Sequence, residues 1–108
     1  DHHLRRVRKI YLERRDALIQ ALRVHFGDVH LIGTEIGTQL TWLLPDRLAS
    51  ARTVCDRARA HGVHVEGVVS ETAKSSRFYD RALILGYAAM TPDQLRHGVA
   101  ALAEAVNG

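Results

Sequence analysis

The sequence predicts an α+β domain in which a small, mostly antiparallel sheet packs against helices. Residues 38–44 alternate between two faces, as a half-buried strand does. Apolar residues recur every three or four positions near both ends of the chain, as in amphipathic helices. The expected elements follow the order helix, strand, strand, helix, strand, strand, helix. With 108 residues and 46% hydrophobic side chains, the chain suffices for one core.

A long first helix is expected over residues 3–26, because its apolar residues are spaced by three, four or seven. Gly27 follows in the position typical of a helix end. A short strand at 29–32 and a strand at 38–44 then form a hairpin around a turn at 33–37. On the second strand one face carries Thr38, Leu40, Trp42 and Leu44, and the other carries Gln39, Thr41 and Leu43.

Pro45 ends this hairpin, and either Asp46 or Ser50 caps the next helix. That helix is expected to end at His61-Gly62 and to be followed by a strand over residues 63–69. A polar loop over residues 70–80 then leads to the last strand, over residues 81–88. Thr91 with Gln94 predicts a reciprocal cap for the final helix, with proline at its first position. The apolar faces expected for the second and last helices are Leu48, Ala51, Val54, Cys55 and Ala58, and Leu95, Val99, Leu102 and Val106.

Composition restricts the class of protein but not its function. The single cysteine, Cys55, cannot form an internal disulfide, which favours a reducing, cytoplasmic location. The longest apolar run, residues 82–90, contains Gly86 and is too short for a membrane span. The chain does not open with a basic segment followed by an apolar one, so secretion is not expected.

Positive charge is concentrated at the start of the chain. Residues 1–26 hold seven basic and three acidic side chains, a balance of +4, whereas the other 82 residues hold eight basic and nine acidic side chains, a balance of −1. Such a helix could attract nucleic acid through its phosphates. A solvated helix face is favoured instead, because no interleaved aromatic residues or base-reading motif accompany the arginines.

The residues contain no self-sufficient catalytic or metal site. Cys55 falls on an apolar helix face, Glu35 and Glu66 are single carboxylates, and Gly33 and Gly37 precede a strand rather than the helix that a phosphate loop requires. No two histidines have the four-residue helical spacing of metal ligands. The histidines are His2, His3, His25, His30, His61, His64 and His97.

Four segments resemble the C-terminal part of MocR-type regulators in the same order. They are residues 3–18 (HLRRVRKIYLERRDAL), residues 37–45, residues 58–65 (ARAHGVHV), and residues 83–88 (LILGYA) followed by Thr91-Pro92 and Gly98-Val99. These regulators belong to the GntR superfamily and join a winged helix-turn-helix to an aminotransferase-like, fold-type-I pyridoxal-phosphate domain. The resemblance covers nearly the whole chain, and the arginine-rich opening and the Leu-Gly-Tyr-Ala strand are its specific parts.

The resemblance implies that residues 1–108 are one C-terminal subdomain of a longer protein, like the small domain of fold-type-I aminotransferases. Residues 1–26 would be a long basic linking helix and residues 28–108 an α/β sandwich. It also implies that pyridoxal phosphate belongs to the preceding large domain and that the parent protein is a homodimer. Neither Lys9 nor Lys74 has the sequence context of the family's Schiff-base lysine, so no catalytic, cofactor-binding or metal residue is assigned here.

One departure from the related enzymes concerns the substrate. Amino-acid aminotransferases of this fold hold the substrate carboxylate with an arginine in the last strand, and the matching position here is Ile84. Arg81 lies three residues earlier, an odd separation that places it on the opposite strand face. The sequence therefore favours an effector- or cofactor-sensing subdomain of a transcriptional regulator. The alternatives are the small domain of a genuine aminotransferase and a free-standing basic nucleic-acid-binding module.

Overall fold

The structure is a computed structural model that describes residues 2–33, 38–60, 66–67 and 81–107. The predicted order of elements is confirmed. The elements are α1 (His2–Phe26), β1 (His30–Ile32), β2 (Gln39–Leu43), α2 (Ala51–Ala60), β3 (Glu66–Gly67), β4 (Ala82–Gly86) and α3 (Pro92–Asn107). Of the strand expected at 63–69, only Glu66–Gly67 is described. The turn residues 34–37, the helix end at His61-Gly62 and the loop at 70–80 lie outside the described residues.

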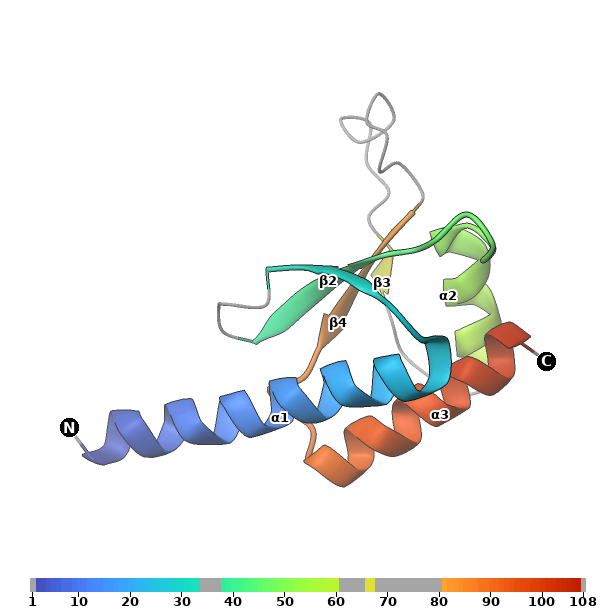
Figure 1. Ribbon diagram of the computed structural model, residues 1–108. Helices are drawn as coiled ribbons and strands as arrows, with labels where there is room; N and C mark the ends of the chain where they lie inside the picture. The colour runs from blue at the N-terminus through green and yellow to red at the C-terminus, as the bar shows by residue number, and fades with distance from the viewer. Residues whose placement is uncertain (1, 34–37, 61–65, 68–80, 108) are drawn as a thin grey trace.

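The four strands form one sheet in the order β1-β2-β4-β3, and each neighbouring pair is antiparallel (Figure 1). The expected hairpin is the β1–β2 pair, in which Leu31 lies opposite Trp42. β4 inserts beside β2, so that Trp42 also lies opposite Leu83. Because directly opposed residues project to the same side of a sheet, these registers align each strand's apolar side chains in cross-strand rows.

One face of the sheet packs against the helices. Leu40, Trp42, Leu83 and Leu85 are all buried in a single core cluster. The helices contribute Leu18, Ala21, Leu22 and Phe26 from α1, Ala51, Val54, Cys55 and Ala58 from α2, and Leu95, Val99, Leu102, Ala103 and Val106 from α3. Helices α1 and α3 run alongside each other below the sheet (Figure 1). The expected α+β arrangement and the apolar faces of α2 and α3 are therefore confirmed.

Helix α1 is only partly covered by the rest of the domain. Its buried residues begin at Ala17, and its N-terminal half extends away from the sheet and the other helices (Figure 1). It ends where the sequence predicts, since Gly27 adopts a φ of 77° and its N–H donates to the Arg23 carbonyl at 2.9 Å. Among the described ranges, no helix combines the length and the apolarity that a bilayer-spanning segment requires.

The structure resolves the alternative left open for α2. Ser50 is the cap, because its Oγ accepts a hydrogen bond from the Thr53 N–H at 3.3 Å while its carbonyl accepts from the Val54 N–H at 2.9 Å. Asp46 lies in the preceding turn and is exposed. The Ser50 cap therefore sets the first turn of α2, and with it the positions of Val54 and Ala58 in the core.

Four arginines tie separate elements together by donating to main-chain carbonyls. Arg47 donates to Phe26 at 2.7 Å and Arg57 to Val106 at 3.4 Å, which satisfies carbonyl groups in the last turns of α1 and α3. Arg14 donates to Ala88, and Arg81 donates to Leu48 at 2.9 Å and to Pro45. These guanidinium groups stabilise the positions of the helices around the sheet.

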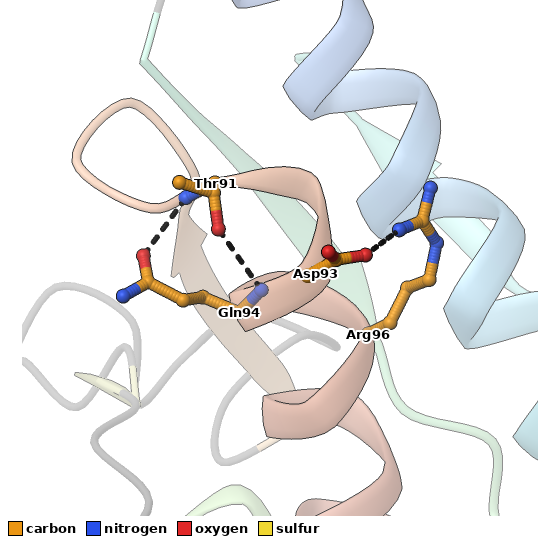
Figure 2. A network of polar contacts seen from close by, with 4 residues as sticks. All are labelled: Thr91, Asp93, Gln94 and Arg96. Atoms are coloured by element: carbon orange, nitrogen blue, oxygen red, sulfur yellow. Dashed lines mark hydrogen bonds and ion pairs between the residues drawn. The ribbon is translucent and has the colours of Figure 1, made fainter.

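The start of α3 carries the predicted reciprocal cap (Figure 2). The Gln94 N–H donates to Thr91 Oγ1 at 3.2 Å, and the Thr91 N–H donates to Gln94 Oε1 at 2.9 Å. Asp93 pairs with Arg96 one turn further on, and both side chains are exposed. The cap satisfies two backbone donors, whereas the ion pair is screened by water.

Replacing Thr91 with alanine should lower the free energy of unfolding by about 1 kcal/mol, because the Gln94 N–H loses its acceptor. Arg96→Ala is the matched control from the same turn, and it should cost less than about 0.5 kcal/mol because it removes only an exposed pair. Urea unfolding followed by circular dichroism measures both. Equal losses in the two variants would show that the cap contributes no more than the surface ion pair.

Candidate functional site

The second face of the sheet is the candidate site. It carries two cross-strand rows, Ile32–Thr41–Ile84 and His30–Leu43–Ala82, which project away from the core face. The exposed fraction of Ile32 is 45%, Thr41 and Ile84 are half-buried, and Leu43 and Ala82 are buried without belonging to the core cluster. Strands β1, β2 and β4 contain no lysine or arginine. This outer face therefore combines apolar side chains with the polar groups of His30, Gln39 and Thr41.

Ile84 occupies the centre of the outer face. It is the middle residue of β4 and lies in register between Thr41 of β2 and Glu66 of β3. Its neighbours Leu83 and Leu85 both belong to the core, so strand alternation directs Ile84 to the other side of the sheet. The part that this position plays toward a ligand stays a prediction.

Arg81 has a structural use in this fold. It precedes β4, and its carbonyl accepts a hydrogen bond from the N–H of Leu44, a residue of the core side. Its guanidinium donates to the carbonyls of Pro45 and Leu48 and so holds the connection between β2 and α2. These bonds direct the cation toward backbone carbonyls. The predicted separation of Arg81 from the Ile84 side is consistent with this geometry.

Of the other residues weighed from the sequence, His30 lies in an outer-face row and Glu66 is in register with Ile84, whereas Cys55 and Lys9 lie elsewhere. Cys55 is buried in the core cluster on α2, and Lys9 is exposed on α1. Within the described ranges, no three histidine, cysteine, aspartate or glutamate side chains lie close enough to hold a metal ion. Lys74, Glu35, His61 and His64 lie outside the described residues. The sequence reasoning missed the carbonyl-binding arginines, because residue spacing alone does not reveal which distant carbonyls they meet.

Tyr87 follows β4 directly and links the site strand to the helices. It is 2% exposed, and its N–H donates to the Thr38 carbonyl at 3.0 Å. Burial raises the pKa of the Tyr87 phenol above its ordinary value of 10.0, and the positive charge of Arg15 opposes part of that shift. The phenol is therefore held in its neutral form in the folded domain.

Stability should fall as the pH rises above about 10, because Tyr87 ionises at its ordinary pKa in the unfolded chain but only at a higher pH in the folded one. The unfolded state then binds fewer protons, which favours unfolding at higher pH. Tyr87→Phe should weaken this decline. Urea unfolding at neutral pH and near pH 11 measures the difference for each protein. An equal decline in both would show that other groups cause the alkaline loss.

Comparison with solved structures places this arrangement among aminotransferases. A multiple substrate aminotransferase from Thermococcus profundus matches 99% of this chain at 26% identity with a TM-score of 0.75. LysN, an α-aminoadipate aminotransferase from Thermus thermophilus, matches 99% of this chain at 26% identity with a TM-score of 0.76. A kynurenine aminotransferase from Pyrococcus horikoshii matches 98% of this chain at 27% identity with a TM-score of 0.75. No protein-family profile and no curated protein sequence matches the chain.

The chain therefore has an aminotransferase-like α+β fold. It covers only 26% of the Thermococcus enzyme and 27% of LysN, so it corresponds to about a quarter of such a protein. The LysN structure contains N-(5'-phosphopyridoxyl)-L-leucine. Neither a GntR-type nor a MocR-type identity follows from these matches, because all three structures are those of aminotransferases.

Proposed function

We propose that this chain is the effector- or cofactor-sensing subdomain of a pyridoxal-phosphate-dependent transcriptional regulator and has no catalytic activity of its own. In the intact polypeptide the outer face of the sheet forms one wall of a ligand cleft, and a preceding large domain and a winged helix complete the protein. Ligand binding then shifts the regulator between two arrangements, which requires that the ligand bind one of them more tightly.

The outer face carries this proposal. An enzyme that processes amino acids needs a cation to hold the substrate carboxylate, and arginine suits this planar anion best. Ile84 stands where the resemblance puts that arginine, and the three strands β1, β2 and β4 contain no lysine or arginine. Arg81 is engaged by the carbonyls of Pro45 and Leu48. A face of this chemistry favours contact with an apolar or uncharged group over capture of a carboxylate.

The residues present do not form a pyridoxal-phosphate site by themselves. Lys9 is exposed on α1, and the outer face provides no lysine and no cationic group for a phosphate among the described strands. The cofactor would therefore be held by the rest of the polypeptide. Ile84 and Thr41 would contribute only side chains that limit the shape of the cleft.

The small domain of a genuine aminotransferase is the second candidate, because the three structures compared above are aminotransferases. The two candidates differ in what the outer face must do. A transaminase must bind a carboxylate next to the cofactor at every turnover, whereas a sensor needs only a difference in ligand affinity between two states. Ile84 favours the sensor.

In the intact polypeptide, adding pyridoxal phosphate should change the affinity for the DNA upstream of its own reading frame by about five-fold or more, the usual range of allosteric coupling. Fluorescence anisotropy at physiological salt measures this, with scrambled DNA as control. The 108-residue chain alone should show no sequence discrimination, and borohydride should trap no cofactor on Lys9 or Lys74. If the intact polypeptide transaminated common amino acids rapidly and showed no DNA preference, the chain would instead be the small domain of a genuine aminotransferase.

A further inference from the structure

Gly86, the last residue of β4, is a glycine that the domain itself does not require. Its φ lies outside the positive region that favours glycine. A methyl group added at Gly86 would lie 3.9 Å from the Thr38 carbonyl oxygen, an ordinary contact, and it would meet no closer atom of the described residues beyond the adjoining ones. The pairing of β4 with β2 is continuous from Ala82 to Gly86, so the glycine does not mark a bulge. Neither backbone strain nor packing within the described domain accounts for a glycine here.

Gly86 belongs to the outer face of the sheet. It lies two residues after Ile84 on the same side of β4, it is exposed, and it is directly opposite Gln39 of β2. The Tyr87 N–H donates to the Thr38 carbonyl at 3.0 Å, so the adjoining pair, Gln39 and Gly86, is of the closely spaced kind without hydrogen bonds between its own residues. A glycine in a strand weakens the strand and often marks the close approach of a ligand. Its place on this face therefore indicates that a ligand comes close to the backbone at Gly86.

The side chains next to Gly86 are uncharged. Gln39 is exposed directly opposite, and half-buried Thr41 forms the next outward pair with Ile84. Among the described residues, no hydrogen bond or ion pair engages the side chain of Gln39 or Thr41. His30 lies in the row of Leu43 and two strands away from β4, more than about 10 Å from Gly86. A group placed over Gly86 thus meets neutral donors and acceptors and an apolar side chain.

We propose that the outer face binds its ligand over Gly86 and recognises there an uncharged donor–acceptor group, a primary carboxamide. The amide of Gln39 offers an oxygen acceptor and an NH₂ donor, so it can exchange two hydrogen bonds with a carboxamide. The Thr41 hydroxyl would supply a further donor or acceptor, and Ile84 would contact the apolar part of the ligand. This inference rests on the proposed function, because it takes the outer face as the wall of a ligand cleft and names the class of ligand.

A carboxylate fits the same position less well. It can only accept hydrogen bonds, so it would leave the Gln39 oxygen without a donor. Its charge would also lose hydration in the cleft without gaining a cation from β1, β2 or β4. L-leucinamide and L-leucine differ at the group in question, and together they are the probes for this proposal.

Gly86→Ala in the intact polypeptide, loaded with pyridoxal phosphate, should lower the affinity for L-leucinamide by about ten-fold or more. The Tm should stay the same or rise, because the domain has room for the methyl group. Gly98→Ala in α3 is the matched control, since an added methyl group there has no described neighbour within 4 Å beyond its own helical turns, and binding should not change. Isothermal titration calorimetry measures the affinities. Equal affinities in the two variants would overturn the proposal.

Gln39→Met should reduce the preference for L-leucinamide over L-leucine by about two- to ten-fold, because methionine keeps the length of the side chain but removes its hydrogen bonds. Gln20→Met, at an exposed glutamine of α1, is the matched control and should keep the preference. Gln39→Arg should reverse the preference, because a guanidinium group pairs with a carboxylate. Comparing the ratio of affinities between variants cancels effects of the amino group that both probes carry.

Tighter binding of L-leucine than of L-leucinamide by the unmodified protein would also overturn the proposal. The calorimetry uses no DNA. The carboxamide preference can therefore fail while cofactor-dependent DNA binding stands, and the reverse result is equally distinguishable.

Discussion

Ile84→Arg in the intact polypeptide should accelerate the reaction of the bound cofactor with common α-amino acids by roughly 10- to 150-fold. A charge-assisted bidentate hydrogen bond to a carboxylate contributes roughly 1.5–3 kcal/mol, and about 1.4 kcal/mol corresponds to a tenfold change. Ile84 lies at the centre of the outer face and is half-buried, so an arginine there would be partly shielded from water. The unmodified protein should bind the cofactor and react negligibly.

The measurement is the rate at which the cofactor's absorbance changes after each amino acid is added. Ile32→Arg is the matched control, because Ile32 lies in the same cross-strand row two strands away, roughly 10 Å from Ile84, and should give no gain. Ile84→Lys separates charge from the bidentate geometry and should give a smaller gain than arginine. A fast reaction of the unmodified protein, with no gain from Ile84→Arg, would show that another arginine binds the carboxylate.

Trp42→Ala should destabilise the domain by about 3–5 kcal/mol, a large part of the roughly 5–15 kcal/mol expected for a natural domain. Trp42 is 1% exposed at the centre of the core face, and its ring lies 4.7 Å from that of Phe26 at an angle of 57°. Removing it would leave a cavity between the sheet and the end of α1, where the surrounding side chains can relax only in part.

Chemical unfolding followed by circular dichroism measures the loss, with Ile32→Ala on the outer face as the control that should cost under about 1 kcal/mol. Trp42→Phe keeps most of the apolar volume and also removes the indole N–H, which is buried without a hydrogen-bond partner among the described residues. It should therefore cost clearly less than Trp42→Ala, and it provides a measurable variant if the alanine protein does not fold. Equal losses from Trp42→Phe and Trp42→Ala would contradict this account.

The sequence predicted the elements well because each depends on local patterns. Strand alternation grouped Leu40 and Trp42 on one face, which is the core face of the structure, and Thr91 with Gln94 identified the start of α3. The same alternation separated Arg81 from Ile84. These inferences depend on only a few neighbouring residues, so they can be made without knowledge of the tertiary structure.

Features that depend on distant residues were beyond the sequence. The insertion of β4 between β2 and β3 is a long-range pairing, and nothing in the spacing of Arg14 indicates that it meets Ala88. The apolar stripe of α1 indicates which side of the helix is apolar, and the domain buries that side only from Ala17 onward. Apolar periodicity shows which side of a helix is suited to burial, but it does not show how many of its turns the domain buries.

The length of helix α1 gives it the geometry of a lever. From Asp16 to His2 the helix continues for about 20 Å beyond its anchored part, at 1.5 Å per residue. A rotation of the sheet and its helices by roughly 10° about that anchor would sweep the far tip of the helix through about 4 Å, roughly three-quarters of the 5.4 Å rise of one helical turn. A small angular adjustment on the side of Ile84 would thus become a displacement at the opposite end of the molecule, large enough to break or form side-chain contacts there.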